Sequence, residues 1–295
     1  MVNAAFFFSV MTLFVKAAGK TLPTAEIVLV RSVFGLVVTW IMLRRAKVDP
    51  WGNRRGLLVV RGIFGFIALI CFYYAVTHLP IAEATVIQYT NPVFVAVLAG
   101  LFLGERLSGR EVGAMVLCLL GVALVARPQT LFGAAAAGFD PLAIAAAVGG
   151  AVATGFAYVL VRKLGATEHP LVTVFYFPLV ATPIALPLVL PYLRWPTPLE
   201  AVYLLCGATC TQLAQISLTR GLQLERAGKA MSMTYLQIVF ATLWGVLFFS
   251  EVPEPLAVLG MVVIVGSTLW LGREKGGDAR KEAGAMVEVR EPEEG

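Results

Sequence analysis

The most regular feature of the chain is a series of apolar runs separated by short polar segments. Ten runs can be distinguished, at residues 1–18, 24–43, 57–76, 81–103, 112–126, 140–161, 170–190, 199–219, 229–250 and 255–272. A membrane-spanning helix needs about 20 predominantly apolar residues, so each run predicts one transmembrane helix. The connecting segments are mostly short, so neighbouring helices are expected to pack antiparallel. The first run begins without the basic leader of a signal peptide, and we expect it to be retained as a helix.

The composition supports an all-α integral membrane protein. Hydrophobic residues make up 59% of the chain and charged residues only 14%, whereas soluble domains carry about 25% charge. This argues against a soluble enzyme, a secreted disulfide scaffold or a nucleic-acid-binding domain. The four cysteines lie in apolar runs and neither histidine has a second candidate ligand beside it, so no metal or other cofactor is expected. The charged residues 274–295 predict a disordered cytoplasmic tail.

Lys and Arg are divided unevenly between the two sides of the predicted membrane. With a cytoplasmic N-terminus, 17 of the 23 lie on the cytoplasmic side and four on the other, and Arg31 and Arg61 fall inside runs. Cytoplasmic loops carry an excess of basic residues. The distribution therefore predicts a multi-pass inner-membrane protein with both termini in the cytoplasm, and it accounts for the net charge of +5 without a nucleic-acid partner.

The second half of the chain repeats the first. Residues 84–127 align with residues 230–273 at a shift of 146, with 11 identities in 44 positions. The matches between scarce residue types are Tyr89/Tyr235, Glu105/Glu251 and Arg127/Arg273. Each half contains five runs, and an odd number makes the second copy enter the membrane from the opposite side. We therefore predict two inverted five-helix repeats, residues 1–127 and 128–273.

Inverted repeats are common in secondary transporters, whose substrate sites lie near the bilayer midplane between the repeats. Two similar halves give inward-open and outward-open states similar energies, so modest binding energy can switch between them. The alternatives at this point are a membrane enzyme and a duplicated membrane scaffold that does not transport.

Residues 72–125 contain an LP-x-A-x-A turn, a mid-run Asn91-Pro92 and a Gly104-Glu105-Arg106 end. This stretch resembles the EamA-type domain of the drug/metabolite transporter superfamily. The second repeat departs from the pattern, with Gln237-Ile238 in place of Asn-Pro and Ser250-Glu251-Val252 in place of Gly-Glu-Arg. The resemblance implies a ten-helix inverted-repeat transporter of small metabolites such as amino acids.

The chain contains no nucleotide-binding motif. A Walker A motif ending at Gly19-Lys20-Thr21 would need glycine at residue 14, which is Phe14, and Gly228-Lys229 is followed by alanine. Transport is therefore expected to depend on a gradient, with a proton or a counter-substrate as coupling partner, or to be facilitated diffusion. The expected partners are a small-molecule substrate and the lipid bilayer.

Polar residues inside the runs are the candidate substrate ligands, because polar groups in lipid are costly and often functional. Gln88 and Asn91 lie three residues apart on one helical face and correspond to Thr234 and Gln237 in the second repeat. The eighth run adds Gln212 and Gln215. All six could line a midplane site and hydrogen-bond a polar solute, or they could link helices by hydrogen bonds.

Aromatic and charged residues provide further candidates. Tyr89 and Tyr235 could wall the site or act as interfacial anchors at span ends. Arg31 is about 10 Å from the nearer membrane face and is expected to pair with Glu26 or with a substrate carboxylate. Arg61, about 6 Å inside the cytoplasmic end, is expected to extend to lipid headgroups. Glu83 either complements a helix dipole or carries a coupling proton.

Proline, glycine and glutamate residues are expected to affect the shape, packing and ends of the helices. Pro92 should kink the fourth span, and Pro178, Pro183 and Pro187 should make the seventh irregular. Gly100 and Gly104 are expected to let helices approach closely. Glu105 and Glu251 are expected to cap or pair at span ends.

Overall fold

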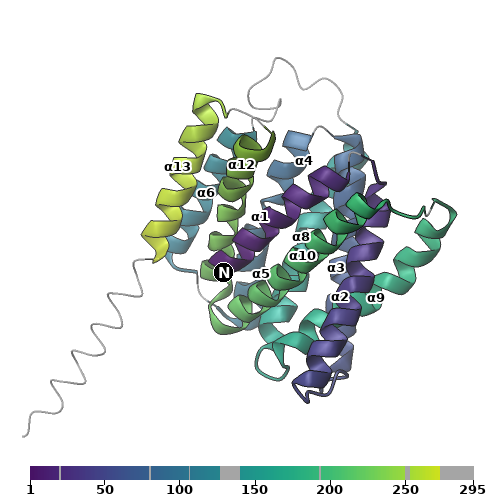
Figure 1. The fold of residues 1–295 in the computed structure, drawn as a ribbon. Helices are drawn as coiled ribbons and strands as arrows, with labels where there is room; N and C mark the ends of the chain where they lie inside the picture. Colours follow the sequence, from purple (N-terminus) through teal and green to yellow (C-terminus); the bar gives the residue numbers. More distant parts are fainter. Residues whose placement is uncertain are drawn as a thin grey trace, which may run out of the picture.

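The computed structural model describes residues 1–19, 21–79, 81–105, 107–126, 140–192, 194–249 and 253–272. Within these ranges all regular secondary structure is helical (Figure 1). The elements of the first repeat are α1 (Val2–Ala18), α2 (Thr24–Arg45), α3 (Arg55–His78), α4 (Ile81–Gln88), α5 (Asn91–Leu103) and α6 (Gly109–Ala126). Those of the second are α8 (Pro141–Leu164), α9 (Pro170–Val189), η1 (Leu190–Tyr192), α10 (Pro198–Leu224), α11 (Ala227–Ser232), η2 (Met233–Tyr235), α12 (Leu236–Phe249) and α13 (Pro255–Gly272).

The ten predicted spans are confirmed. Eight helical segments are long and apolar enough to cross a membrane, and the apolar α1 and α13 are slightly shorter. The predicted boundaries differ most at α10, which continues to Leu224 instead of ending at residue 219. The predicted tail, the repeat boundary near residue 127 and Glu251 lie outside the described residues.

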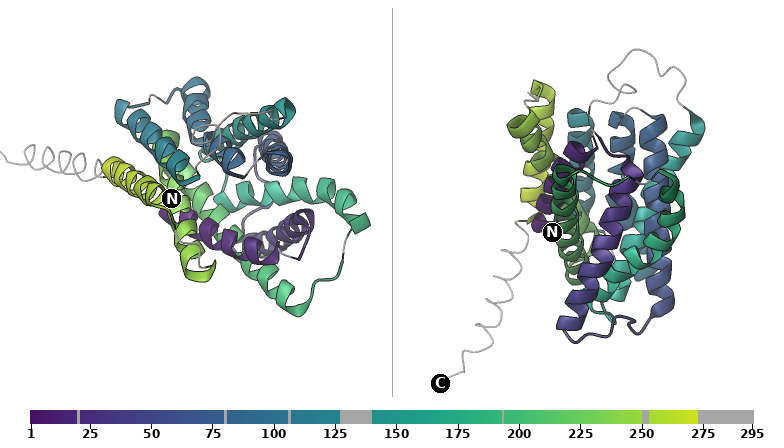
Figure 2. Two further views of the ribbon diagram at one scale, coloured as in Figure 1. Left: turned by 90° about the horizontal axis from the view of Figure 1, so that it is seen from above. Right: turned by 45° about the vertical axis from the view of Figure 1, so that its right-hand side comes forward.

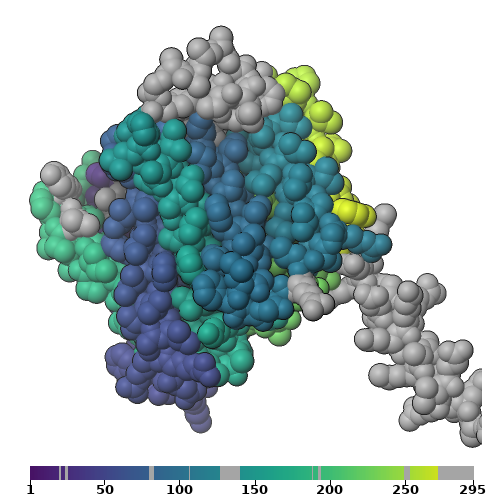
Figure 3. Space-filling view, turned by 180° about the vertical axis from the view of Figure 1, so that it is seen from behind, coloured from purple at the N-terminus to yellow at the C-terminus, as the bar shows by residue number. Residues whose placement is uncertain are grey.

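The outer surface of the bundle is apolar, as lipid contact requires. Seen from behind, much of this surface is formed by α3, α6 and α8 (Figure 3). Large hydrophobic side chains are exposed along these helices, among them Ile63, Ile67, Ile70, Val116, Leu120 and Val148. In the two views of Figure 2 the helices pack into one bundle in which some are tilted strongly against the others.

The packing of the helices has the symmetry of an inverted repeat. The first helix of each repeat packs on the third helix of the other, α1 on α10 and α8 on α3. Likewise, α1 packs on α12 of the second repeat, and its equivalent α8 packs on α5 of the first repeat. Equivalent helices also face each other, α2 against α9 and α6 against α13. The protein is therefore an all-α membrane protein of ten spans in two inverted five-helix repeats.

The fourth span of each repeat is broken near its middle. In the first repeat, the break at Tyr89 and Thr90 separates α4 from α5, and Pro92 occupies the first turn of α5 as expected beside a kink. In the second repeat the 3-10 turn η2 separates α11 from α12 without a proline. By contrast, α9 contains Pro178, Pro183 and Pro187 and is still continuous from Pro170 to Val189. The irregularity expected there is limited to the following turn η1.

The expected close approach of helices at Gly100 and Gly104 is wrong. Gly104 ends α5 with a φ of 68°, and a Cβ there would meet no atom of the described residues within 4 Å. Its role is conformational, because this left-handed C-cap favours glycine. A Cβ on Gly100 would approach only the carbonyl of Glu105. The close approach occurs instead between α6 and α13, at Gly121 and Gly260.

Candidate functional site

The two broken spans meet at equivalent tyrosines. The Tyr235 hydroxyl donates a hydrogen bond of 3.0 Å to the backbone carbonyl of Tyr89, and the two rings stack with centroids 6.1 Å apart. Tyr235 is completely buried and packs with Cys118 of α6 and Ile264 of α13. The alternative that these tyrosines are interfacial anchors is therefore wrong, since both lie in mid-span where the repeats touch.

Replacing Tyr235 with phenylalanine is expected to destabilise this contact modestly. Loss of one neutral hydrogen bond costs about 1 kcal/mol, which corresponds to a fall of roughly 2–4 °C in the apparent melting temperature in detergent. Tyr89→Phe is the matched control, because the acceptor is the backbone carbonyl of residue 89 and the bond survives. Equal effects of the two substitutions would contradict the role of the Tyr235 hydroxyl.

The polar residues predicted as substrate ligands flank the two breaks. Gln88, Asn91, Thr234 and Gln237 are all half-buried. Asn91 is the first residue of α5, and Gln237 is the second of α12. The Thr234 hydroxyl bonds to the carbonyl of Met231 at 2.6 Å and so also stabilises its own turn. Each break therefore places an amide at the start of a half-helix, and contact with substrate stays a prediction.

The two candidate glutamines of α10 have different surroundings. Gln212 donates through Nε2 to the Thr39 hydroxyl of α2 at 2.6 Å, and Thr39 in turn donates to the carbonyl of Gly35. Gln212 therefore links two helices, as the alternative to substrate binding proposed. The Oε1 atom of Gln215 is buried and has no hydrogen-bond partner among the described residues, so its amide is the better placed of the two to receive a ligand.

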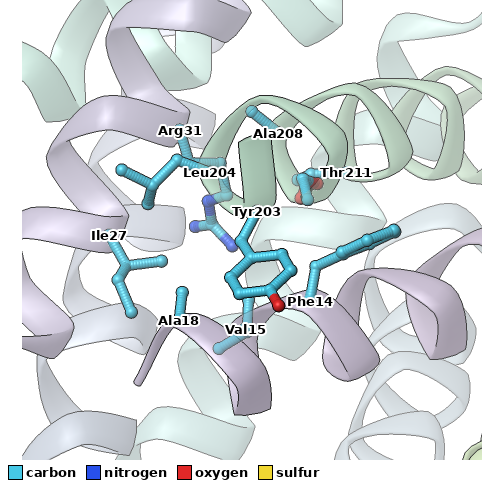
Figure 4. Close-up of a pocket in the computed structure, with 10 residues that line it drawn as sticks. Phe14, Val15, Ala18, Ile27, Arg31, Tyr203, Leu204, Ala208 and Thr211 are labelled. Atoms are coloured by element: carbon cyan, nitrogen blue, oxygen red, sulfur yellow. Dashed lines mark hydrogen bonds between the residues drawn. The ribbon is translucent and has the colours of Figure 1, made fainter. Parts of the chain in front are cut away.

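Arg31 lines a small pocket between α1, α2 and α10 (Figure 4). The other lining residues are Phe14, Val15, Ala18, Ile27, Tyr203, Leu204, Gly207, Ala208 and Thr211. The guanidinium of Arg31 points into the space between these side chains (Figure 4) and is the one charged group among the described residues of the lining. Within the described ranges, neither Glu26 nor another carboxylate lies at ion-pair distance from it. The expected ion pair between Arg31 and Glu26 is therefore not formed.

Arg61 does not extend to the headgroups, so that expectation is wrong. Its side chain turns inward on α3 and is only 3% exposed, with the guanidinium 5.5 Å from the ring of Phe177 on α9. The neighbouring Gly62 allows α3 and α9 to approach, since a Cβ there would lie 2.8 Å from a Val180 methyl group. The burial of Arg61 could not be predicted from the sequence, because depth along a span does not reveal which side of the helix a residue faces.

Glu83 lies in the first turn of α4 and is buried. A carboxylate at this position favours the positive end of the helix dipole, in agreement with the simpler of its two expected roles. Proton carriage by Glu83 stays a prediction.

Two equivalent loop contacts join the repeats. In the loop between α8 and α9, the Glu168 carboxylate accepts hydrogen bonds from the backbone N–H groups of Asn53 (2.9 Å) and Arg54 (2.6 Å), the two residues that precede α3. In the segment before α10, Arg194 donates to the carbonyl of Thr21 and to Glu200 of α10. A shift of 147 residues maps Thr21 onto Glu168 and Asn53 onto Glu200, so the two contacts join equivalent positions of the repeats.

Glu105 and His169 both have partners at the ends of helices. Glu105 pairs with Arg162 at 2.7 Å and accepts from the N–H of Ala227 at the start of α11, which confirms its expected capping and pairing role. His169 caps α9 by accepting from the N–H of Leu171. Desolvation, and then the positive charge of Arg220, lower the pKa of the His169 imidazole and favour the neutral ring that accepts this bond.

Comparison with known proteins agrees with this architecture. The EamA-like transporter family matches residues 1–127 and 141–273, and the chain belongs to this family. It is 37% identical over 279 residues to the pseudopaline exporter CntI of Pseudomonas aeruginosa, covering 94% of this chain and 95% of the exporter. It is 31% identical to mouse solute carrier family 35 member G1, with coverage of 90% and 75%.

More distant matches extend the same picture. The S-adenosylmethionine uptake transporter of Rickettsia felis is 23% identical, covering 87% of this chain and 85% of that protein. A crystal structure of a protein 20% identical in sequence superposes with a TM-score of 0.77 over 90% of this chain and 92% of the other, which shows the shared fold. The chain is a multi-pass membrane transport protein.

Proposed function

We propose that this protein is a secondary transporter that moves a small polar or amphipathic, amino-acid-like metabolite across the inner membrane by alternating access. The observation that carries the proposal is the exchange-symmetric packing of the repeats, with the two broken spans meeting at Tyr89 and Tyr235. Helices broken at corresponding positions are typical of transporter sites near the midplane. Because CntI is an exporter, we propose export as the direction.

The distribution of charged residues supports an orientation of the protein in the membrane and a candidate residue for proton coupling. The excess of Lys and Arg on one side supports cytoplasmic termini, which places the lower face of Figure 1 in the cytoplasm. Glu83 is the candidate proton carrier. The proposed function is tested with purified protein in liposomes and with metabolite profiles of overexpressing and deletion cells. Transport without chemical change supports a transporter, whereas turnover of a substrate by detergent-solubilised protein would favour a membrane enzyme.

Substitution of the amides at the breaks tests the predicted site, formed by Gln88, Asn91, Thr234 and Gln237. Asn91→Ala or Gln237→Ala should each raise the apparent transport constant roughly threefold to tenfold, because one lost hydrogen bond costs about 0.5–1.5 kcal/mol. Val97→Ala is the control on α5, since Val97 is 46% exposed on the outer surface. If the amide variants instead melt earlier and transport with unchanged affinity, the amides link helices, and Gln215 becomes the better candidate ligand.

A further inference from the structure

Arg61 is a buried cation whose donors are not satisfied by the protein. Its Nε and Nη1 atoms are buried and have no hydrogen-bond partner among the described residues. Within the same ranges no carboxylate lies at ion-pair distance from it. The guanidinium carbon lies 5.5 Å from the centroid of the Phe177 ring, which supplies no hydrogen-bond acceptor of the kind that a carboxylate or carbonyl would. A buried charge normally requires a paired and hydrogen-bonded partner, so Arg61 lacks an anion.

A second arginine lies on the neighbouring span. Arg31 on α2 has no carboxylate at ion-pair distance among the described residues, and its guanidinium points into the pocket between α1, α2 and α10 (Figure 4). The helices that carry the two arginines, α2 and α3, pack on α8, α9 and α10 of the other repeat. Both arginines therefore lie on helices that move against the other repeat if the repeats rock.

The chemistry of the two guanidinium groups indicates which ligand they would bind. Guanidinium groups bind planar carboxylates with two parallel hydrogen bonds. An amine would be repelled by two positive charges, and a neutral solute would leave both charges uncompensated in a membrane interior, where they are costly.

We propose that Arg61, together with Arg31, binds the carboxylate groups of the transported solute, and that this solute is therefore anionic. The proposal rests on the proposed transport function and names its substrate class. It also predicts a conflict between stability and function at Arg61, because an empty site leaves a buried charge unpaired until substrate enters.

Arg61→Met tests the proposal, because methionine fills much of the same volume without the charge. In ligand-free detergent solution the variant should melt at the same temperature as the wild type or higher, since it removes an uncompensated charge. Transport of the anionic solute should fall at least tenfold. Arg220→Gln, which removes an exposed arginine of α10, should change neither measurement.

The ligand class is read from metabolite profiles of cells that express the wild type, Arg61→Met, Arg31→Met or Arg220→Gln. Solutes whose levels respond to the wild type should carry carboxylates and net negative charge, and the response should vanish in Arg61→Met and Arg31→Met only. Responding solutes that are cationic or neutral would overturn the carboxylate site and leave the transporter intact. An Arg61→Met variant that melts earlier and still transports would also overturn the carboxylate site. If no solute responds to the wild type, the proposed transport function itself fails.

Discussion

Replacing Gly260 with valine is expected to lower the apparent melting temperature in detergent by about 10 °C. A Cβ on Gly260 would lie 2.6 Å from the backbone carbonyl oxygen of Gly121, and a Cβ on Gly121 would lie 2.8 Å from the carbonyl oxygen of Gly260. Backbone atoms cannot rotate away as side-chain ends do, so α6 and α13 must separate. Overpacking of this kind costs about 3 kcal/mol, and each kcal/mol shifts the melting temperature by roughly 2–4 °C.

Gly266 provides the matched control on the same helix. It is exposed, and a Cβ there would meet no atom within 4 Å. Gly266→Val changes helix propensity by less than about 1 kcal/mol, so its melting temperature should stay close to that of the wild type. Melting temperatures are measured by heating detergent extracts and quantifying the soluble monodisperse protein. A Gly260→Val variant as stable as Gly266→Val would show that α6 and α13 do not pack at these glycines.

The spans could be predicted from the sequence because the bilayer sets a required length of about 20 apolar residues. The repeat could be predicted because its shift aligns scarce residues such as Tyr89 and Tyr235. That these two tyrosines touch each other could not be predicted, since the shift shows that two positions are equivalent and says nothing about the distance between them.

The rotation of each helix was the main unknown. A soluble helix reveals its buried face through amphipathic periodicity, but lipid and protein interior are both apolar, and this signal is lost in a span. Arg61 was therefore expected at the headgroups and is instead buried against Phe177. Likewise, Gly100 and Gly104 have the spacing of a packing pair, whereas the pair in contact, Gly121 and Gly260, lies on two helices of different repeats.

Polar residues in loops posed a different problem. Glu168 looks like an ordinary loop carboxylate in the sequence, and its partners are backbone N–H groups 115 and 114 residues away. Backbone donors leave no trace in a sequence pattern. The equivalence of Glu168 with Thr21 and of Asn53 with Glu200 becomes informative only once both loop contacts are known.

Replacing Glu168 with alanine is expected to lower the apparent melting temperature by about 5–10 °C. The carboxylate is 6% exposed and accepts three hydrogen bonds from the N–H groups of Asn53 and Arg54. Hydrogen bonds to a charged group are worth about 1.5–3 kcal/mol each, and removing the acceptor strands these donors. Because the three bonds share one carboxylate, their contributions do not simply add. We expect the free energy of unfolding to fall by roughly 2–4 kcal/mol in total.

Asp49→Ala is the control in the loop that Glu168 contacts, since exposed Asp49 accepts a 3.2 Å bond from the N–H of Trp51. It should change the melting temperature by no more than about 2 °C. The comparison also bears on mechanism, because Glu168 joins a loop of the second repeat to the start of α3 in the first. If this contact opens during each transport cycle, Glu168→Ala should melt earlier while transport per folded molecule is kept or increased. If the contact must instead stay closed, transport per folded molecule should fall as well. An unchanged melting temperature would show that Glu168 does not hold the two loops together.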